Sequence, residues 1–180
     1  MWTRHVDGHL ATLSVPRSPR ASPRANPGEA SPGACVWLTG RSGVGKSTIA
    51  AGVVEQLRER GRPATVVDDP EVGRHLDADD PVGALTWLTR LLVESGVVVV
   101  VAVDTPARDR REQLRTQVPG FVEVFVDGRG RPDDTYEEPF APELRVPTHD
   151  RESAASVAQI VSFLEDAGVM AHDPPHPSDA

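Results

Sequence analysis

The amino-acid sequence predicts an α/β protein, a three-layer sandwich with a doubly wound parallel sheet. Segments of strand length alternate with segments of helix-forming composition from residue 34 onward, and such alternation favours right-handed crossovers between parallel strands. The segment 97–103, VVVVVAV, is apolar at every position. An uninterrupted apolar run is typical of a central strand that is buried on both faces.

The remaining elements follow from apolar runs and from the glycines that separate them. Glycine favours the position after a helix, because it readily adopts the left-handed conformation found there. Gly61, Gly96 and Gly168 end three of the four expected helices. In chain order we expect strands at 34–39, 64–68, 97–103, 121–126 and 143–146, and helices at 46–60, 84–95, 107–117 and 151–167.

The two ends of the chain differ from its middle in composition. Residues 1–33 are rich in Pro, Arg, Ser and Ala and lack hydrophobic periodicity, so we expect a disordered leader there. This segment contains no continuous apolar run of the kind that directs secretion. We expect a single folded domain at 34–168 and a disordered tail at 169–180.

Charge and cysteine content narrow the class of protein. The net charge of −8 and the pI near 5.2 argue against a nucleic-acid surface. No stretch is apolar enough to span a bilayer, so small molecules, a partner protein or a second copy in a homodimer are the expected partners. Cys35 is the only cysteine, which excludes a disulfide within the chain and indicates a buried, inert thiol. A reducing cytoplasm fits these features.

The segment Gly40 to Thr48, GRSGVGKST, is the most informative motif. It has the G-x-x-x-x-G-K-[ST] pattern (Walker A) and lies between an expected strand and helix, which predicts a phosphate-binding loop of the P-loop NTPase type. In such a loop the backbone amides surround phosphates, the lysine contacts the terminal phosphates and the first hydroxyl ligates Mg²⁺. We therefore expect ATP to bind Gly40, Ser42, Gly43, Val44, Gly45, Lys46, Ser47 and Thr48, with Ser47 as a metal ligand. The alternative is a chance glycine-rich connection.

From about Cys35 to Leu164 the chain resembles adenylylsulfate kinase, which phosphorylates the 3′-hydroxyl of adenosine 5′-phosphosulfate. The matching segments occur in the order found in the family: VWLTGRSGVGKST, VVDD at 66–69, ESGVVVVVAVDTPARDRREQLR at 94–115, FVEVFV at 121–126 and DDTYEEPFAPELRVPT at 133–148. The resemblance implies a P-loop kinase domain at 34–168, the use of ATP and Mg²⁺, and transfer of the γ-phosphoryl group to a hydroxyl.

The segment after the second strand departs from the family pattern. Family members have Asp-Gly-Asp-Asn there, whereas this chain has Asp68, Asp69, Pro70 and Glu71, with proline at the catalytic position. A one-residue shift relative to the family would let Asp69 or Glu71 serve as the catalytic acid and Arg74 as the substrate-binding arginine, and Asp68 is a further candidate acid. The alternative is that these acids form a solvated turn.

Two segments are shorter than in the family. The region after Leu76 lacks the family's stacking Phe and its Asn–Arg–Arg cluster, and the basic lid expected after Val126 is reduced to Arg129 and Arg131. Phosphoryl transfer depends on positioning and charge. These losses argue that the acceptor is not adenosine phosphosulfate, or that another chain supplies the missing groups.

Asp104 is an acid at a position where members of the family usually have none. Asp104 follows the apolar run 97–103, where the carboxyl end of a buried strand would place it near the phosphate loop. It is a candidate base or Mg²⁺ ligand, and the alternative is a helix cap near Pro106, with Thr105 competing for that role. The resemblance implies that Arg108 binds substrate and that Thr148 lies near the nucleotide base.

The other arginines of the same expected helix invite a simpler interpretation. Arg110, Arg111 and Arg115 are expected to form a solvated face paired with Glu112.

The sequence leads to three functional hypotheses. The first is an ATP-dependent small-molecule kinase with Lys46, Asp68, Asp69 and Asp104 as its catalytic residues. The second is a catalytically degenerate nucleotide-binding or regulatory protein, and the third is an NTPase switch that needs no acceptor.

Overall fold

The computed structural model describes residues 32–68, 81–129, 135–149 and 151–169. Its helices and strands alternate along the chain. In order they are β1 (Ala34–Thr39), α1 (Lys46–Glu59), β2 (Ala64–Asp68), α3 (Pro81–Glu94), β3 (Val98–Ala102), α4 (Arg108–Gln117), β4 (Phe121–Asp127), β5 (Leu144–Pro147) and α5 (Ser153–Asp166). Each expected helix and strand is present, and the largest shift is in α3, which begins at Pro81 rather than at residue 84. Proline suits a first helical turn, where no backbone N–H is needed.

The strands form a single parallel sheet in the order β2-β3-β1-β4-β5. β1 lies at its centre, between β3 and β4. The connection after β1 leads toward β2, whereas the connection after β4 leads toward β5 on the opposite side. Such a reversal opens a crevice at the carboxyl ends of the strands, and the phosphate loop follows β1 directly.

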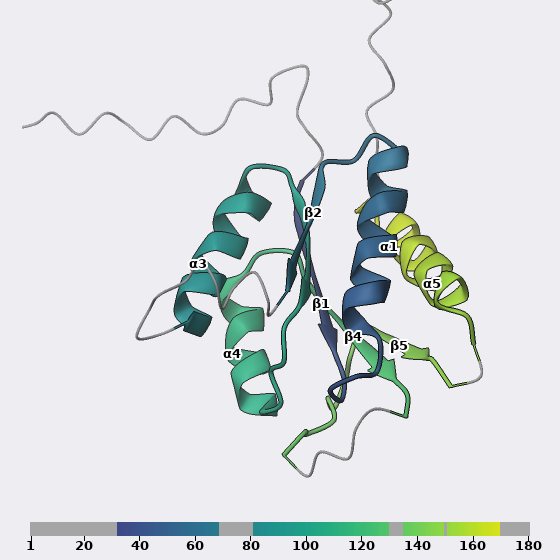
Figure 1. The fold of residues 1–180 in the computed structure, drawn as a ribbon. Coiled ribbons are helices and arrows are strands. Elements are labelled where there is room, and N and C mark those ends of the chain that lie inside the picture. The colour runs from purple at the N-terminus through teal and green to yellow at the C-terminus, as the bar shows by residue number, and fades with distance from the viewer. Residues whose placement is uncertain (1–31, 69–80, 130–134, 150, 170–180) are drawn as a thin grey trace, which may run out of the picture.

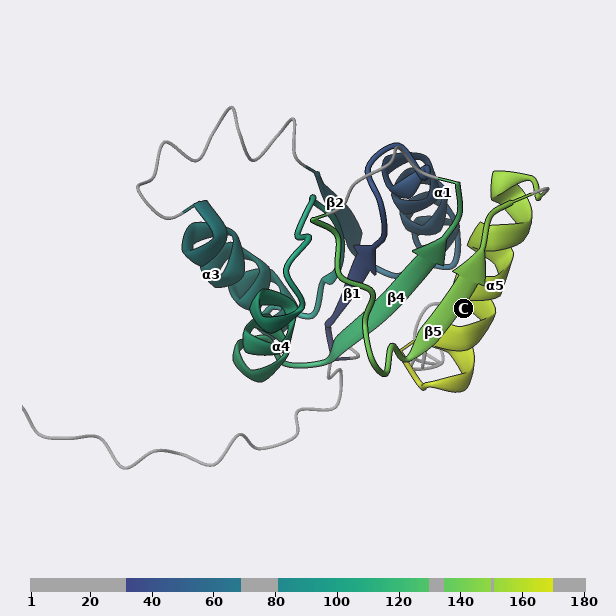
Figure 2. The same ribbon diagram turned by 90° about the horizontal axis from the view of Figure 1, so that it is seen from below.

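Helices cover both faces of the sheet. Helices α1 and α5 lie together on one face, and α3 and α4 lie on the other (Figure 1), an arrangement that the view from below also shows (Figure 2). The doubly wound sandwich predicted from the sequence is therefore confirmed.

The hydrophobic core divides into two clusters because neighbouring strand residues point to opposite faces. In β1, Val36 and Leu38 pack toward α1 and α5, whereas Cys35 and Trp37 pack toward α3 and α4. The residues of β3 are buried on both sides, as the uninterrupted valine run predicts. Cys35 is fully buried, and burial raises the pKa of its thiol, which keeps it protonated and unreactive.

Several sequence-based expectations lie outside the described residues. They concern most of the leader and tail, together with Asp69, Pro70, Arg74 and Arg131. Within the described part of the chain, no helix is both long and apolar enough to cross a membrane.

Candidate active site

The phosphate loop connects β1 to α1 and passes close to β4. Gly40 has φ 153°, and a Cβ atom at this position would lie 2.5 Å from the carbonyl oxygen of Val126. Any side chain there would push the loop away from the sheet, so the close approach requires glycine. Gly45 is the N-cap of α1, with no side-chain cap and no acidic residue in the first turn. The positive end of the helix dipole therefore faces the loop without a protein carboxylate in that turn, which favours an anionic ligand.

Lys46 is held by three oxygen atoms. Its Nζ donates hydrogen bonds to the carbonyl oxygens of Gly40 at 2.9 Å and Arg41 at 3.2 Å, and to Asp104 Oδ1 at 2.6 Å. The Lys46 side chain is 6% exposed, whereas that of Asp104 is 48% exposed. The lysine is thus positioned by the loop itself, and its carboxylate partner faces solvent.

Asp104 lies two residues beyond the end of β3 and reaches the phosphate loop, as the sequence predicted for an acid in this position. The alternative interpretation as a helix cap is wrong. Helix α4 begins at Arg108 with Ala107 as its N-cap, and the backbone N–H of Arg108 donates to Glu137 Oε2 at 2.8 Å. The first N–H group of α4 is thus bound by the Glu137 carboxylate, about thirty residues further along the chain, and not by Asp104.

Two cavities adjoin the phosphate loop and share Gly43, Gly45 and Thr48. The first, of about 410 Å³, is also lined by Ser42, Lys46, Ser47, Ala102 and Asp104. We call it the Asp104 cavity. The second, of about 300 Å³, is also lined by Val44, Ile49, Arg129, Thr148, His149, Arg151, Ser153 and Ser156. We call it the Thr148 cavity.

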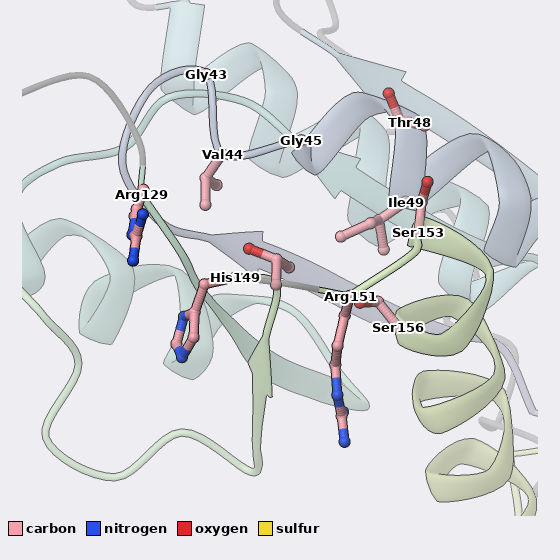
Figure 3. A pocket seen from close by; sticks show the side chains of 11 residues that line it. Gly43, Val44, Gly45, Thr48, Ile49, Arg129, His149, Arg151, Ser153 and Ser156 are labelled. Atoms are coloured by element: carbon pink, nitrogen blue, oxygen red, sulfur yellow. The ribbon is translucent and has the colours of Figure 1, made fainter.

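The Thr148 cavity lies between the loop and the beginning of α5. Figure 3 shows Val44 and Ile49 pointing into it from the loop and α1, while Arg129 and His149 lie along its other side. The Thr148 backbone N–H donates to the carbonyl oxygen of Asp127 at 2.8 Å, which ties the chain after β5 to the end of β4. Thr148 therefore lies beside the phosphate loop, and its place near a nucleotide base stays a prediction.

The oxygen donors beside Lys46 suit a magnesium ion. Mg²⁺ prefers carboxylate, hydroxyl, phosphate and water oxygens and usually takes only one or two protein ligands. The Ser47 hydroxyl and the Asp104 carboxylate both line the Asp104 cavity, and both side chains are exposed. This donor set fits Mg²⁺ carried by a nucleotide, with phosphates and water completing the coordination.

Two other predicted site residues lie at the same edge of the sheet. Asp68 ends β2 and is in register with Ala102 of β3, so it lies one strand away from the chain that leads to Asp104. Arg108 is engaged by a distant segment: its Nε donates to the carbonyl oxygen of Glu138 at 2.8 Å, and its guanidinium lies 3.6 Å from the centroid of the Phe140 ring. A substrate would have to compete for Arg108.

The expectation of a solvated arginine face on α4 is wrong for Arg111. Its side chain is 1% exposed, and its Nε donates to Glu123 Oε1 at 2.8 Å in a pair whose carboxylate is 2% exposed. Arg115 also contacts Glu123, at 3.1 Å, and is 25% exposed. An acid in the apolar strand sequence FVEVFV is the signal that could have revealed this pair, because a buried carboxylate needs a cation.

A parallel sheet of this order, with a phosphate loop after its central strand, defines a P-loop nucleotide-binding protein. Comparison with known proteins then gives the particular family. A family model described as adenylylsulphate kinase matches residues 32–132. The chain therefore belongs to the adenylylsulfate kinase family, a family of ATP-dependent kinases.

Individual relatives agree with this assignment. The adenylyl-sulfate kinase of Gloeothece citriformis is 32% identical over 171 residues, covering 77% of this chain and 97% of that protein. A second, from Synechococcus sp. JA-3-3Ab, is 38% identical over 104 residues, covering 53% of this chain and 59% of that protein. Among solved structures, the Mycobacterium tuberculosis APS kinase CysC in complex with AMPPNP and APS has a TM-score of 0.68 at 26% identity, covering 74% of this chain and 98% of that one.

Proposed function

We propose that this protein is a kinase that transfers the γ-phosphoryl group of ATP to the hydroxyl of a small molecule other than adenosine phosphosulfate. The observation that carries the proposal is the contact between Lys46 and Asp104 at the phosphate loop. It combines a cation for the terminal phosphates with a carboxylate at the place where a metal ligand or base is needed. Family membership supports the ATP-dependent kinase class, whereas the acceptor is inferred from this chain's own residues.

The two cavities divide the roles of the site. ATP would extend its base into the Thr148 cavity and its phosphates through the loop, with the γ-phosphate beside Lys46 and the Asp104 cavity. That the Mycobacterium tuberculosis relative was solved with AMPPNP and APS supports a site for two nucleotide-like ligands on this fold. Mg²⁺ held by Ser47 and Asp104 would neutralise charge on the β- and γ-phosphates.

Asp104 has one of two roles in the transfer step. As a base, its carboxylate takes the proton of the acceptor hydroxyl while the hydroxyl oxygen bonds to the γ-phosphorus and the bond to the β-phosphate oxygen breaks, releasing ADP. As a metal ligand, it holds Mg²⁺ directly or through water. Asp68, the last residue of β2, and Asp69, which lies outside the described residues, remain further candidates for the same roles.

The acceptor is proposed to be smaller or less anionic than adenosine phosphosulfate. Of the lid arginines, only Arg129 lies in the described part of the chain, and it lines the Thr148 cavity rather than the Asp104 cavity. Arg108, which would bind substrate by family resemblance, donates to Glu138 and stacks on Phe140. Among the described residues, few cations are therefore placed to hold a sulfated phosphate, and Glu137 and Glu138, which bind Arg108, would repel it.

A phosphorylation screen tests the proposal directly. Purified protein is incubated with ATP, Mg²⁺ and a panel of hydroxyl-bearing metabolites that includes adenosine phosphosulfate, and phosphorylated products are detected by mass spectrometry. Lys46→Ala is the matched control. We expect a product from another acceptor and little from adenosine phosphosulfate. Turnover of adenosine phosphosulfate at ordinary kinase rates, on the order of 1–100 per second, would overturn the inferred acceptor.

A second candidate function is a catalytically degenerate nucleotide-binding protein with a regulatory role. It is favoured by one observation: three protein oxygens already surround the Lys46 ammonium, which has three protons to donate. The same screen separates the candidates, because this protein would bind ATP and yield no product. Release of free phosphate without an acceptor would instead identify an NTPase switch.

The organisation of the chain forms part of the proposal. We assign the kinase domain to residues 34–168, with the leader 1–33 and the tail 169–180 outside it, in a cytoplasmic protein. A homodimer or a partner protein would supply the cations that the shortened lid lacks. Size-exclusion chromatography with light scattering, with and without ATP–Mg²⁺, measures the oligomeric state.

A further inference from the structure

Arg111 makes contacts that an ion pair alone does not require. Besides Glu123, its guanidinium contacts three backbone carbonyl oxygens. Its Nη1 donates to Thr105 at 2.7 Å and to Pro106 at 2.9 Å, and its Nη2 donates to Glu137 at 2.5 Å. The buried side chain therefore joins two segments that are separate in sequence: the turn after β3, and the segment Tyr136–Phe140, which we call the strap.

Both of these segments are connected to the phosphate loop through hydrogen bonds. Thr105 directly follows Asp104, whose carboxylate accepts a hydrogen bond from Lys46. The strap residue Tyr136 shares a hydrogen bond of 3.0 Å with the Thr39 hydroxyl, one residue before Gly40. The Glu137 backbone N–H donates to the Pro106 carbonyl oxygen at 3.0 Å, so the turn and the strap also bind each other.

The aromatic ring of Tyr136 completes this arrangement. It stacks on Phe125 of β4 with a centroid distance of 6.2 Å, and the Arg111 guanidinium lies 5.4 Å from its centroid. Burial raises the pKa of Tyr136 above its usual 10.0, so the phenol stays protonated and keeps its hydrogen bond to Thr39.

We propose that Arg111 is a positioning residue for the active site. By holding the Thr105–Pro106 turn and the strap in one hydrogen-bonded unit, it fixes Asp104 opposite Lys46 and the strap against the start of the phosphate loop. Its effect on phosphoryl transfer rests on the proposed function, whereas its effect on the Lys46–Asp104 contact does not. Arg111 lines neither cavity, so it acts through other groups and is not a catalytic residue.

The geometry requires arginine in particular. A planar guanidinium can donate to Glu123 from one edge and to the three carbonyl oxygens from its other nitrogens. The single ammonium of a lysine has three donors at one point and cannot reach all four acceptors. Arg111→Lys therefore retains a cation near Glu123 but loses contacts with the turn or the strap.

The same helix offers a matched control. Arg115 is also bound to Glu123, but its other contacts are with the carboxylates of Glu112 and Glu143 and with the ring of Phe121. It has no hydrogen bond to the turn or to the strap among the described residues. Arg115→Lys thus perturbs the ion pairs of α4 without perturbing the unit that we propose.

The chain contains a built-in probe, because Lys46 is its only lysine. Brief acylation of the full-length protein, followed by peptide mass spectrometry, measures the Lys46 amine against the N-terminal amine. The lysine introduced at position 111 falls in a different peptide. We expect Arg111→Lys to increase Lys46 labelling roughly tenfold, the ratio that corresponds to losing one charge-assisted hydrogen bond, and Arg115→Lys to leave it unchanged.

A double-mutant cycle excludes a merely structural effect. If Arg111 acts through Asp104, then Arg111→Lys changes Lys46 labelling far less in an Asp104→Asn background than in wild type. Equal labelling of the Arg111→Lys and Arg115→Lys proteins, or full additivity with Asp104→Asn, would overturn the inference. If Arg111→Lys fails to fold, the pair Arg111→Met with Glu123→Leu removes the carbonyl contacts without leaving an unpaired buried charge, and the same labelling result is required.

The assay separates this inference from the proposed function. Labelling needs neither ATP nor an acceptor, so a protein without kinase activity still tests the role of Arg111. Once an acceptor is known, Arg111→Lys should lower kcat more than it raises KM for ATP, because a misplaced Asp104 affects transfer more than nucleotide binding. An unchanged kcat despite increased labelling would confine the role of Arg111 to the nucleotide-free site and overturn its role in transfer.

Discussion

Two ion pairs of nearly equal length lie in very different surroundings. Lys46 and Asp104 are 2.6 Å apart, and the carboxylate is 48% exposed. Arg111 and Glu123 are 2.8 Å apart, and both side chains are at most 2% exposed. Distance therefore does not distinguish the two pairs, whereas burial does.

Burial decides what each pair can do. A buried pair that loses one partner leaves an unpaired charge at low dielectric, so the Arg111–Glu123 contact has to persist. Asp104 is half exposed, so water and counterions can replace Lys46 at its carboxylate, while the buried ammonium keeps its hydrogen bonds to Gly40 and Arg41. The Lys46–Asp104 contact can therefore open more easily than the buried pair. The first pair suits a fixed support, and the second suits a site where phosphate and metal displace existing contacts.

Removing Glu123 tests this contrast through its largest expected effect. Glu123→Ala leaves the Arg111 guanidinium buried without its carboxylate, and we expect the free energy of unfolding to fall by about 3–5 kcal/mol. Urea denaturation followed by circular dichroism measures the change. The control is Arg90→Ala, which breaks the exposed pair with Glu94 on α3 and should cost about 0.5 kcal/mol or less. Similar losses for both variants would contradict the role given to burial.

Removing Lys46 should affect binding instead of stability. Lys46→Ala deletes the cation that faces the terminal phosphates, and we expect ATP–Mg²⁺ affinity to fall roughly a hundredfold, as for the loss of strong charge-assisted hydrogen bonds. The fold should stay intact, because the ammonium contributes little to the core. Calorimetric titration of both proteins measures the difference. Equal affinities would show that the loop does not bind phosphate as proposed.

Neutralising Asp104 sharpens the comparison further. Asp104→Asn retains the shape of the side chain but not its charge, so we expect turnover to fall roughly a hundredfold with little change in stability. The dependence of turnover on Mg²⁺ concentration separates the two roles. A metal ligand predicts a higher Mg²⁺ requirement, whereas a base predicts lower kcat at an unchanged requirement. Wild-type turnover together with an unchanged Mg²⁺ requirement would remove Asp104 from the mechanism.

The same contrast explains what the sequence could predict. The order of helices and strands and the phosphate loop follow from local patterns: apolar runs, glycines and a contiguous motif. The position of Asp104 beside Lys46 also follows, because parallel strands bring their carboxyl ends to one edge. These inferences need only the fold class and the ends of its strands.

The buried pair could not be derived in this way. Arg111 is one of several arginines on α4, and the sequence does not show that it is buried while its neighbour Arg110 is partly exposed. Its partner Glu123 lies on another element, and its carbonyl acceptors include Glu137, far along the chain. The contacts of Arg108 with Glu138 and Phe140 cannot be derived from the sequence for the same reason. Such contacts depend on tertiary packing, which sequence periodicity does not encode.

The smallest expected effect concerns Glu143, which is partly exposed and binds Arg115, the second arginine in contact with Glu123. Burial alone would raise its pKa, but hydrogen bonds from Arg115 and from the Glu123 backbone N–H outweigh burial and hold the pKa below its usual 4.5. A carboxyl group whose pKa is lowered by folding stabilises the folded protein above its unfolded pKa, and that contribution is lost as the pH falls through the folded pKa.

Glu143→Gln removes this titration while retaining a similar shape. We expect the variant to be slightly less stable than wild type at pH 7, and the two unfolding free energies to converge as the pH is lowered past 4.5. Thermal unfolding from pH 7 to 3 measures both curves. Glu112→Gln is the control, because Glu112 is half exposed and lies 3.6 Å from Arg115, the arginine that also binds Glu143. A constant difference across this range would show that Glu143 stabilises the protein by packing and not by its charge.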